Sequence, residues 1–140
     1  MVEPKELDFI WRLNDYINNL GLFAWSDVGV LDDGDSISLM AMPGGEETVF
    51  FDGIRDKNYQ MQVNAKSQNQ FNCIEALSQV ARVLENLQED EIQSHNDSFD
   101  FESINITSPL SIVAHDEQGF FIYALNISAK ITIYENERVV

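Results

Sequence analysis

The chain has 140 residues, 44% of them hydrophobic, and its aromatic side chains are nine Phe, four Tyr and two Trp. Eight Lys and Arg stand against 24 Asp and Glu, which gives a net charge of 8 − 24 = −16. This apolar content excludes a disordered acidic tract, and the scarcity of cations argues against direct binding to DNA or to an anionic membrane. Two interpretations of the charge remain open: a surface that repels nucleic acid, and a surface that imitates it.

The chain has a single cysteine, which excludes an internal disulfide framework and favours a reducing compartment. Its first residues have neither the basic nor the apolar region of a signal peptide, and no apolar run approaches the roughly 18 residues of a membrane span. We therefore expect a soluble protein that makes no use of the secretory route and no contact with a membrane.

The first predicted element is a helix that begins at Glu3-Pro4 and ends near Leu20, because apolar residues recur there every three or four positions. Gly21 stands where a left-handed helix C-cap is expected. The segment 22–30 predicts at most a short strand, and 31–35 predicts a turn.

Strands are predicted next at 36–41 and at Thr48–Phe51, and each is followed by a turn rich in Gly, at Pro43–Gly45 and at Asp52-Gly53. Residues 58–66, beyond the Asp52-Gly53 turn, alternate strictly between polar and apolar side chains. This pattern predicts a strand with one buried face and one wet face. The apolar positions are Tyr59, Met61, Val63 and Ala65, and the polar positions are Asn58, Gln60, Gln62, Asn64 and Lys66.

Ser67 and Gln70 have the spacing of a capping box and predict the start of an amphipathic helix that continues to Leu87. An acidic loop follows at 88–98. The remainder predicts β-structure: a strand at 99–108 whose alternation changes phase near Ser103, then a hairpin of 111–114 with 120–134. A strand of fifteen residues spans roughly 50 Å, so we expect it to bend or to reach beyond the core.

Together these elements predict an α+β fold, a mostly antiparallel or mixed β-sheet packed by two α-helices, in a single domain of residues 1–140. No internal repeat or linker interrupts the pattern.

Few residues are candidates for chemistry. His95 and His115 lie in polar turns without a convergent third partner, so we interpret both as surface histidines. Cys73 falls near the first turn of the second predicted helix, where a helix dipole can stabilise a thiolate, but its neighbours Phe71 and Ile74 favour an unreactive buried cysteine.

The acidic stretch Asp32–Ser36 suggests a calcium loop at first sight. No EF-hand register places a Gly at its sixth position and a Glu at its twelfth, and Asp with Gly is also typical of a tight turn before a strand. We favour the turn. Since no phosphate loop, nucleophile elbow or metal-ligand pair is present either, we expect no enzyme activity, no catalytic or metal-binding residue and no cofactor.

The strand after Asp52-Gly53 is the strongest candidate for an interaction surface. Amides hydrogen-bond in both directions and are dehydrated at a lower cost than carboxylates, so a face of amides with a few cations suits contact with another acidic subunit. A solvated sheet face is the equally open alternative. The candidate subunit interface consists of Arg55, Lys57, Asn58, Tyr59, Gln60, Gln62, Asn64 and Lys66.

The order of these elements resembles a known family. The segments SISLMAMPGGEE and FFDGIRDKNYQMQVNAKSQNQ, with the patterns R-x-x-x-Y-x-x-Q-V and K-S-x-x-Q, are similar to the tail terminator proteins, also called minor capsid proteins, of long-tailed phages (siphoviruses) and prophages of Gram-positive bacteria. The resemblance covers nearly the whole chain.

This resemblance implies a structural virion protein that is assembled in the host cytoplasm and closes into a ring, typically hexameric, at the head-proximal end of the tail. Such a ring ends polymerisation of the tail tube and joins it to the head completion or connector protein. The implied partners are therefore other copies of the chain, the tube protein and the connector, with DNA only passing through.

The charge has a use in such a ring, because carboxylates in the lumen repel passing DNA at short range. The candidate acidic loop or lumen residues are Asp32, Asp33, Asp35, Glu89, Asp90 and Glu91. Arg55, Lys57 or Lys66 could pair with acids across the subunit boundary, the head-to-tail contact that closes a ring. The alternative function is a small acidic DNA mimic that inhibits a host DNA-binding protein, and an acidic adaptor without a ring also remains open.

Overall fold

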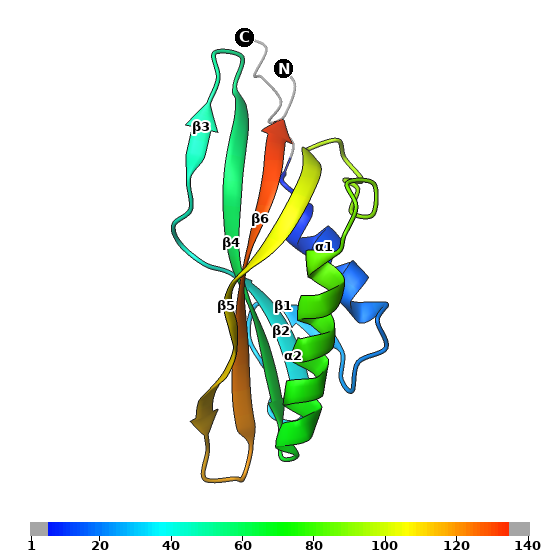
Figure 1. The fold of residues 1–140 in the computed structure, drawn as a ribbon, viewed down its shortest axis with the longest axis vertical. Helices are drawn as coiled ribbons and strands as arrows, with labels where there is room; N and C mark the ends of the chain where they lie inside the picture. The colour runs from blue at the N-terminus through cyan, green and yellow to red at the C-terminus, as the bar shows by residue number, and fades with distance from the viewer. Residues whose placement is uncertain (1–5, 135–140) are drawn as a thin grey trace.

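The structure is a computed structural model, and it describes residues 6–134. This part of the chain contains two helices and six strands, an α+β fold as the sequence predicts (Figure 1). In chain order the elements are α1 (Phe9–Asn18), β1 (Ser26–Val28), β2 (Ser36–Ala41), β3 (Glu47–Val49), β4 (Ile54–Ser67), α2 (Gln70–Glu85), β5 (Phe99–His115) and β6 (Phe121–Tyr134).

The six strands form one mixed sheet, in which five follow the order β1-β2-β4-β6-β5 and β3 pairs with β4. Only the β1–β2 pair is parallel among the described strands, and the other pairs are antiparallel. One edge of β4 serves two partners, since β2 pairs with residues 61–66 and β3 pairs with residues 55–57. The β3–β4 hairpin therefore extends the sheet beyond β2, at the upper end of the molecule in Figure 1.

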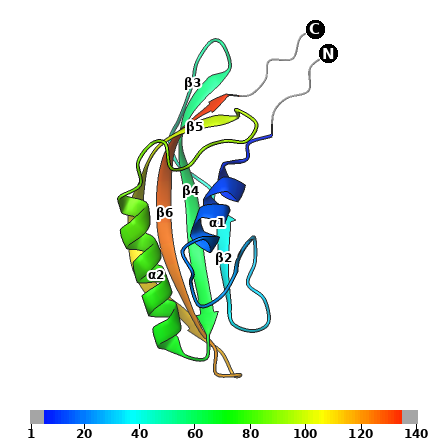
Figure 2. The same cartoon turned by 90° about the vertical axis from the view of Figure 1, so that its right-hand side faces the viewer.

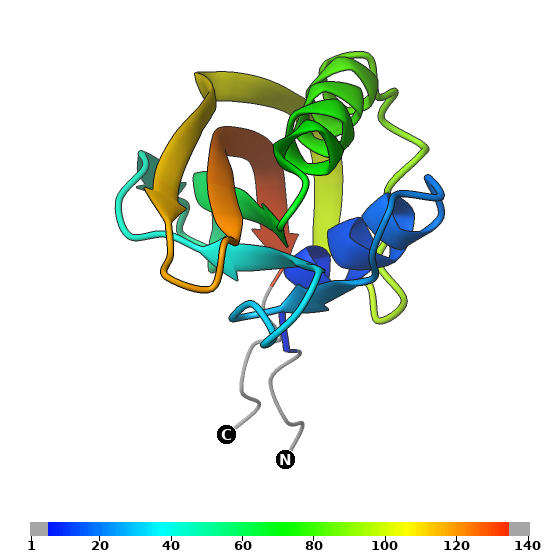
Figure 3. The same ribbon diagram turned by 90° about the horizontal axis from the view of Figure 1, so that it is seen from below.

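The long strands differ in regularity. β4 and β6 pair without interruption from Ile54 with Tyr134 to Ser67 with Phe121. β5 pairs with β6 through four register shifts, the first of them between Phe101 and Ser103, where the sequence predicts a change of phase. Such bulges bend a strand and increase its twist, and Figure 3 shows β5 curling away from a flat sheet. Residues 111–115 are exposed, so the β5–β6 hairpin also reaches beyond the core.

Both helices cover the same face of the sheet (Figure 2). They bury Phe9, Leu13 and Ile17 from α1 and Leu77, Val80 and Leu84 from α2 against alternate side chains of the central strands. The sheet side of this core includes Leu39, Met61, Val63, Ala65, Leu125, Ile127, Ile131 and Ile133. Neither described helix is long and apolar enough to cross a membrane.

Two predicted helix starts are wrong. Residues 6–8 are not helical and α1 begins at Phe9, while Glu3 and Pro4 lie outside the described residues. The second helix is capped by Asn69, whose Oδ1 accepts a hydrogen bond from the Phe71 N–H at 3.1 Å. Ser67 is the last residue of β4, and its Oγ accepts from the Asn69 N–H at 3.1 Å, so it supports the turn between strand and helix.

The bounds of two further elements, α2 and β3, also differ from those predicted. α2 ends at Glu85, although Leu87 beyond it is still buried. β3 covers Glu47–Val49 rather than Thr48–Phe51, because Phe50 and Phe51 turn the chain into β4.

Candidate functional site

The sheet face that the helices leave uncovered carries a ladder of polar side chains, which we call the amide face. It is formed by Asn58, Gln60, Gln62 and Asn64 of β4, by Asn126 and Ser128 of β6 and by Ser38 of β2. The strict alternation of β4 puts its amides on this face and its apolar residues in the core, as predicted.

Cross-strand hydrogen bonds orient these amides. The side-chain N–H₂ of Gln60 donates to Ser128 Oγ at 2.8 Å, and that of Gln62 donates to Asn126 Oδ1 at 2.9 Å. Asn64, only 8% exposed, donates to Ser38 Oγ at 3.3 Å. Gln60 and Gln62 are half-buried, and the hydrogen bonds described use only part of their capacity. The amide face is therefore ordered in the subunit and can still accept hydrogen bonds from a partner.

Of the basic candidates, Lys66 follows the amides on the same face of β4, whereas Arg55 and Lys57 lie apart from them, and all three have contacts within the chain. Arg55 Nη1 is 2.8 Å from Glu47 Oε1, and Lys57 Nζ is 3.9 Å from Glu47 Oε2. Lys66 Nζ donates to the Asp32 carbonyl at 3.0 Å and lies 4.8 Å from the centre of the Phe120 ring. By strand alternation Arg55 and Lys57 occupy the face of β4 opposite the amides.

Tyr59 shares that opposite face and belongs partly to the core. Its ring meets Phe9 edge to face at a centroid distance of 5.7 Å, and burial raises the pKa of Tyr59 above its usual value. The eight residues of the predicted interface thus divide between two faces of β4.

The two predicted acidic groups lie at opposite ends of α2. Asp35 is close enough to Cys73, in the first turn of α2, to affect its titration. Glu89, Asp90 and Glu91 follow the C-terminal end of the same 16-residue helix, which rises about 24 Å. All six acidic candidates are exposed. The structure does not bring the two groups together into one surface.

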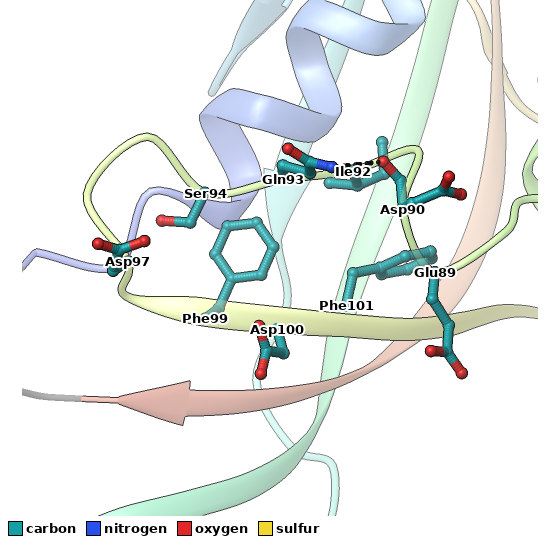
Figure 4. A pocket seen from close by; sticks show the side chains of 9 residues that line it. All are labelled: Glu89, Asp90, Ile92, Gln93, Ser94, Asp97, Phe99, Asp100 and Phe101. Carbon is teal, nitrogen blue, oxygen red and sulfur yellow. Dashed lines mark hydrogen bonds between the residues drawn. The ribbon is translucent and has the colours of Figure 1, made fainter.

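The loop after α2 forms a shallow acidic pocket of 420 Å³ against the start of β5. Glu89, Asp90, Asp97 and Asp100 line it together with the rings of Phe99 and Phe101. Figure 4 shows the carboxylates spread along the pocket rather than converging on one point. Within residues 6–134, no group of three or more His, Cys, Asp or Glu side chains is arranged to hold a metal ion.

The loop is fastened to the chain before α1 by Asp8. Its carboxylate accepts hydrogen bonds from Ser94 Oγ at 2.7 Å, Ser98 Oγ at 2.8 Å and the His95 N–H at 2.8 Å. Burial alone would raise the pKa of Asp8, but these hydrogen bonds outweigh it and hold the pKa below its usual value. This contact explains why Asp8 does not cap α1 with its side chain.

The other residues considered for chemistry have structural or surface positions. Cys73 is fully buried, and burial, followed by the nearby charge of Asp35, raises its pKa to about 11. His95 and His115 are both exposed, and the His115 ring stacks on Phe121 at 4.0 Å. The prediction of a buried thiol and two surface histidines is confirmed.

One feature was missed from the sequence: an apolar knob at the turn of the β3–β4 hairpin. Val49 is 64% exposed, Phe50 47% and Phe51 fully exposed. The sequence contained a signal for this feature, because Phe50 and Phe51 are consecutive apolar residues directly before the Asp52-Gly53 turn. A strand with one solvent-exposed face would alternate apolar and polar residues there.

No individual curated protein matches the chain. Residues 16–133 match the family described as bacteriophage tail terminator protein, which spans all of β1 to β5 and nearly all of β6. The matched segment contains the amide face, both acidic groups and the β3–β4 hairpin. The chain therefore belongs to the bacteriophage tail terminator family, whose members are structural components of the virion tail.

Proposed function

We propose that this protein acts as a single-domain subunit of a ring, a hexamer by its family resemblance, at the head-proximal end of the tail tube. The ring ends tube polymerisation and joins the tube to the head connector after assembly in the host cytoplasm. The observation that carries this proposal is the family match over residues 16–133. The role requires interfaces and no catalytic residue, cofactor or metal.

The amide face supports this proposal as a subunit or partner interface. At a net charge of −16, two copies of the chain repel one another unless they meet through a surface without carboxylates. The half-buried Gln60 and Gln62 offer such a surface, and their side chains are already held by cross-strand hydrogen bonds. Little side-chain entropy is then lost on association.

The cations contribute to this interface less directly than the sequence suggests. Arg55 and Lys57 share Glu47 within the subunit, so a contact across the boundary would have to extend that ion pair or replace it. Lys66 donates to a backbone carbonyl rather than to a carboxylate, so its ammonium group is available to an acid on a neighbour.

The two acidic groups can face the passing DNA at two different heights along the axis of the ring. One group, at 32–35, lies near the start of α2, and the other, at 89–91, lies near its end. If α2 is inclined toward the ring axis, only one group can line the narrowest part of the lumen.

The alternative of a DNA mimic receives less support. Mimicry requires carboxylates in ordered rows on one surface, whereas the two acidic groups are separated by the length of α2 and the most regular polar face consists of amides. The family match also favours the terminator.

A single substitution tests the role of the amide face. Gln62→Glu adds a carboxylate to the centre of the amide face, where we expect it to weaken assembly about tenfold or more through like-charge repulsion. Gln118→Glu makes the same chemical change in the exposed β5–β6 turn and serves as the control. Light scattering across concentration, followed by negative-stain imaging, measures ring formation.

Rings formed by the wild type and by Gln118→Glu, but not by Gln62→Glu, would support the proposal. A compact monomer or dimer that also ignores tube ends would contradict it, and rings of unchanged stability in Gln62→Glu would remove the amide face from the interface.

A further inference from the structure

The structure holds an exposed apolar knob and, elsewhere on the same chain, an open apolar groove. The knob, which we call the aromatic tip, consists of Val49, Phe50 and Phe51. The groove lies between the second half of α2 and the middle of β5 and has a volume of 560 Å³. Its lining includes Ala81, Arg82, Ile106, Pro109, Leu110 and Leu125.

The aromatic tip is built to stay in place. The Phe50 N–H donates to the Ile54 carbonyl at 2.8 Å, and the Gly53 N–H donates to the Phe50 carbonyl at 3.1 Å. Gly53 has φ +86°, which closes this turn at little cost. A rigid turn that displays two Phe side chains to water is costly in a monomer and useful in an interface, since little entropy is lost when the rings are buried.

The groove has the size and the lining to receive such a tip. Its volume lies within the ~300–1,000 Å³ typical of pockets that enclose a compact ligand, and Ala81, Leu110 and Leu125 supply apolar walls. A pair of aromatic side chains from a protruding turn is therefore an occupant of suitable size.

Charge also matches. Among residues 6–134, Arg82 is the basic side chain for which neither an ion pair nor a side-chain hydrogen bond is formed, and it stands at the rim of the groove. Asp52 follows the two Phe residues in the tip and is exposed. Glu85 lies one turn beyond Arg82 on the groove, so an arriving Asp52 is expected on the Arg82 side.

The tip cannot occupy the groove of its own chain. Leu125 in the groove pairs with Val63, nine residues along β4 from Ile54 at the base of the tip. Nine strand residues span about 30 Å, and Figures 1 and 2 place the tip beyond the helices at one end of the molecule. Two different patches that complement each other make a head-to-tail contact, which generates a ring when its rotation closes.

We propose that the aromatic tip of one subunit inserts into the α2/β5 groove of the next copy of this chain, with Asp52 beside Arg82. This contact rests on the proposed ring and supplies it with a specific head-to-tail joint. Phe51 is the anchor, because its side chain is wholly exposed in the subunit and would be buried in the groove.

A charge exchange tests the joint. Asp52→Lys and Arg82→Glu alone should each weaken ring formation about tenfold or more, and the double exchange should restore it to within a few fold of the wild type. Glu117→Lys makes a charge change equal to that of Asp52→Lys in the exposed β5–β6 turn and should leave assembly unchanged. Light scattering measures assembly of the free chain. If the free chain stays monomeric, the same measurement is made on tubes capped by the chain.

Phe51→Ser provides a second, uncharged test. Its side chain contacts solvent only, so the variant should unfold like the wild type and yet assemble at least about tenfold more weakly. Normal assembly of Phe51→Ser, or a double exchange no better than either single one, would overturn the joint while wild-type rings and capped tubes would still uphold the proposed function. If the wild type neither forms rings nor caps tubes, the proposed function fails, and the joint fails with it.

Discussion

Asp8 shows how one carboxylate joins the start of α1 to the loop that follows α2. Its three hydrogen bonds come from Ser94, His95 and Ser98, more than 80 positions along the chain. Because they hold the pKa of Asp8 below its usual 3.8, their stabilising effect is present above about pH 4 and is lost as the pH falls through the lowered value.

Asp8→Asn should therefore lower the free energy of unfolding by about 1–3 kcal/mol at pH 7, the usual worth of hydrogen bonds to a charged group. The difference from the wild type should shrink as the pH is lowered below about 4, since the wild-type carboxyl is then protonated as well. Urea unfolding at a series of pH values measures both. A difference that stays constant down to pH 2 would show that the charge of Asp8 is not what the loop recognises.

Cys73 gives a second prediction at the level of a single residue. Its thiol is fully buried, and its pKa is raised to about 11. Because the thiolate is the reactive form, a maleimide should label Cys73 in the native protein at least about a hundredfold more slowly than in urea. Complete labelling of the native protein within minutes would contradict the buried position of the first turn of α2.

At the scale of elements, the connection from β2 to β3 depends on a close approach of backbone to β4. Gly45 has φ +91°, and a Cβ at this position would lie far inside contact distance of the Asn58 carbonyl oxygen. Gly44, its neighbour, has a similar φ of +98° and open space around it. Substitutions at Gly44 and Gly45 therefore distinguish the cost of backbone strain, which both share, from the cost of a steric clash, which only Gly45 has.

Gly44→Ala should cost about 1–2 kcal/mol of unfolding free energy through strain alone, and Gly45→Ala should cost about 1–3 kcal/mol more through overpacking. Hydrogen exchange should show the amides of β3 losing protection in Gly45→Ala and keeping it in Gly44→Ala. Equal effects of the two substitutions would mean that β3 is not held against β4 in the way described.

The same elements show what the sequence could and could not predict. The alternation in β4 predicted its buried and wet faces correctly, because strand geometry alone decides which side chain points where. The start of α1 could not be predicted, since the Asp8 carboxylate binds the loop at residues 94–98, which a local pattern does not contain. Ser67 looked like a cap because capping patterns are local, whereas its place at the end of β4 depends on pairing with Phe121.

The candidate site was predicted in part for the same reason. The amides of β4 were identified, but their partners Ser38, Asn126 and Ser128 come from other strands and depend on register. Arg55 and Lys57 were expected to reach a neighbour, and the partner they have within the chain, Glu47, is set by the β3–β4 pairing. The separation of the two acidic groups follows from the direction of α2, which a linear pattern does not contain.

At the scale of the whole molecule, the distribution of charge and apolar surface suits a subunit that functions as part of an assembly. The core face of the sheet is closed by two helices, while Gln60 and Gln62 of the amide face, the aromatic tip and the α2/β5 groove remain accessible to solvent. The amide face lies on the side of the sheet opposite the helices, whereas the groove lies beside α2 and the aromatic tip lies at one end of the molecule (Figures 1 and 2).

The most direct test of the account is the addition of this protein to polymerising tail-tube protein, with tube length and tube ends measured by negative-stain electron microscopy. We expect tube growth to stop at substoichiometric amounts of this protein, and we expect a ring with a central opening at one end of each tube. Tubes of unchanged length with bare ends would contradict the assignment of this chain as the subunit that terminates the tail.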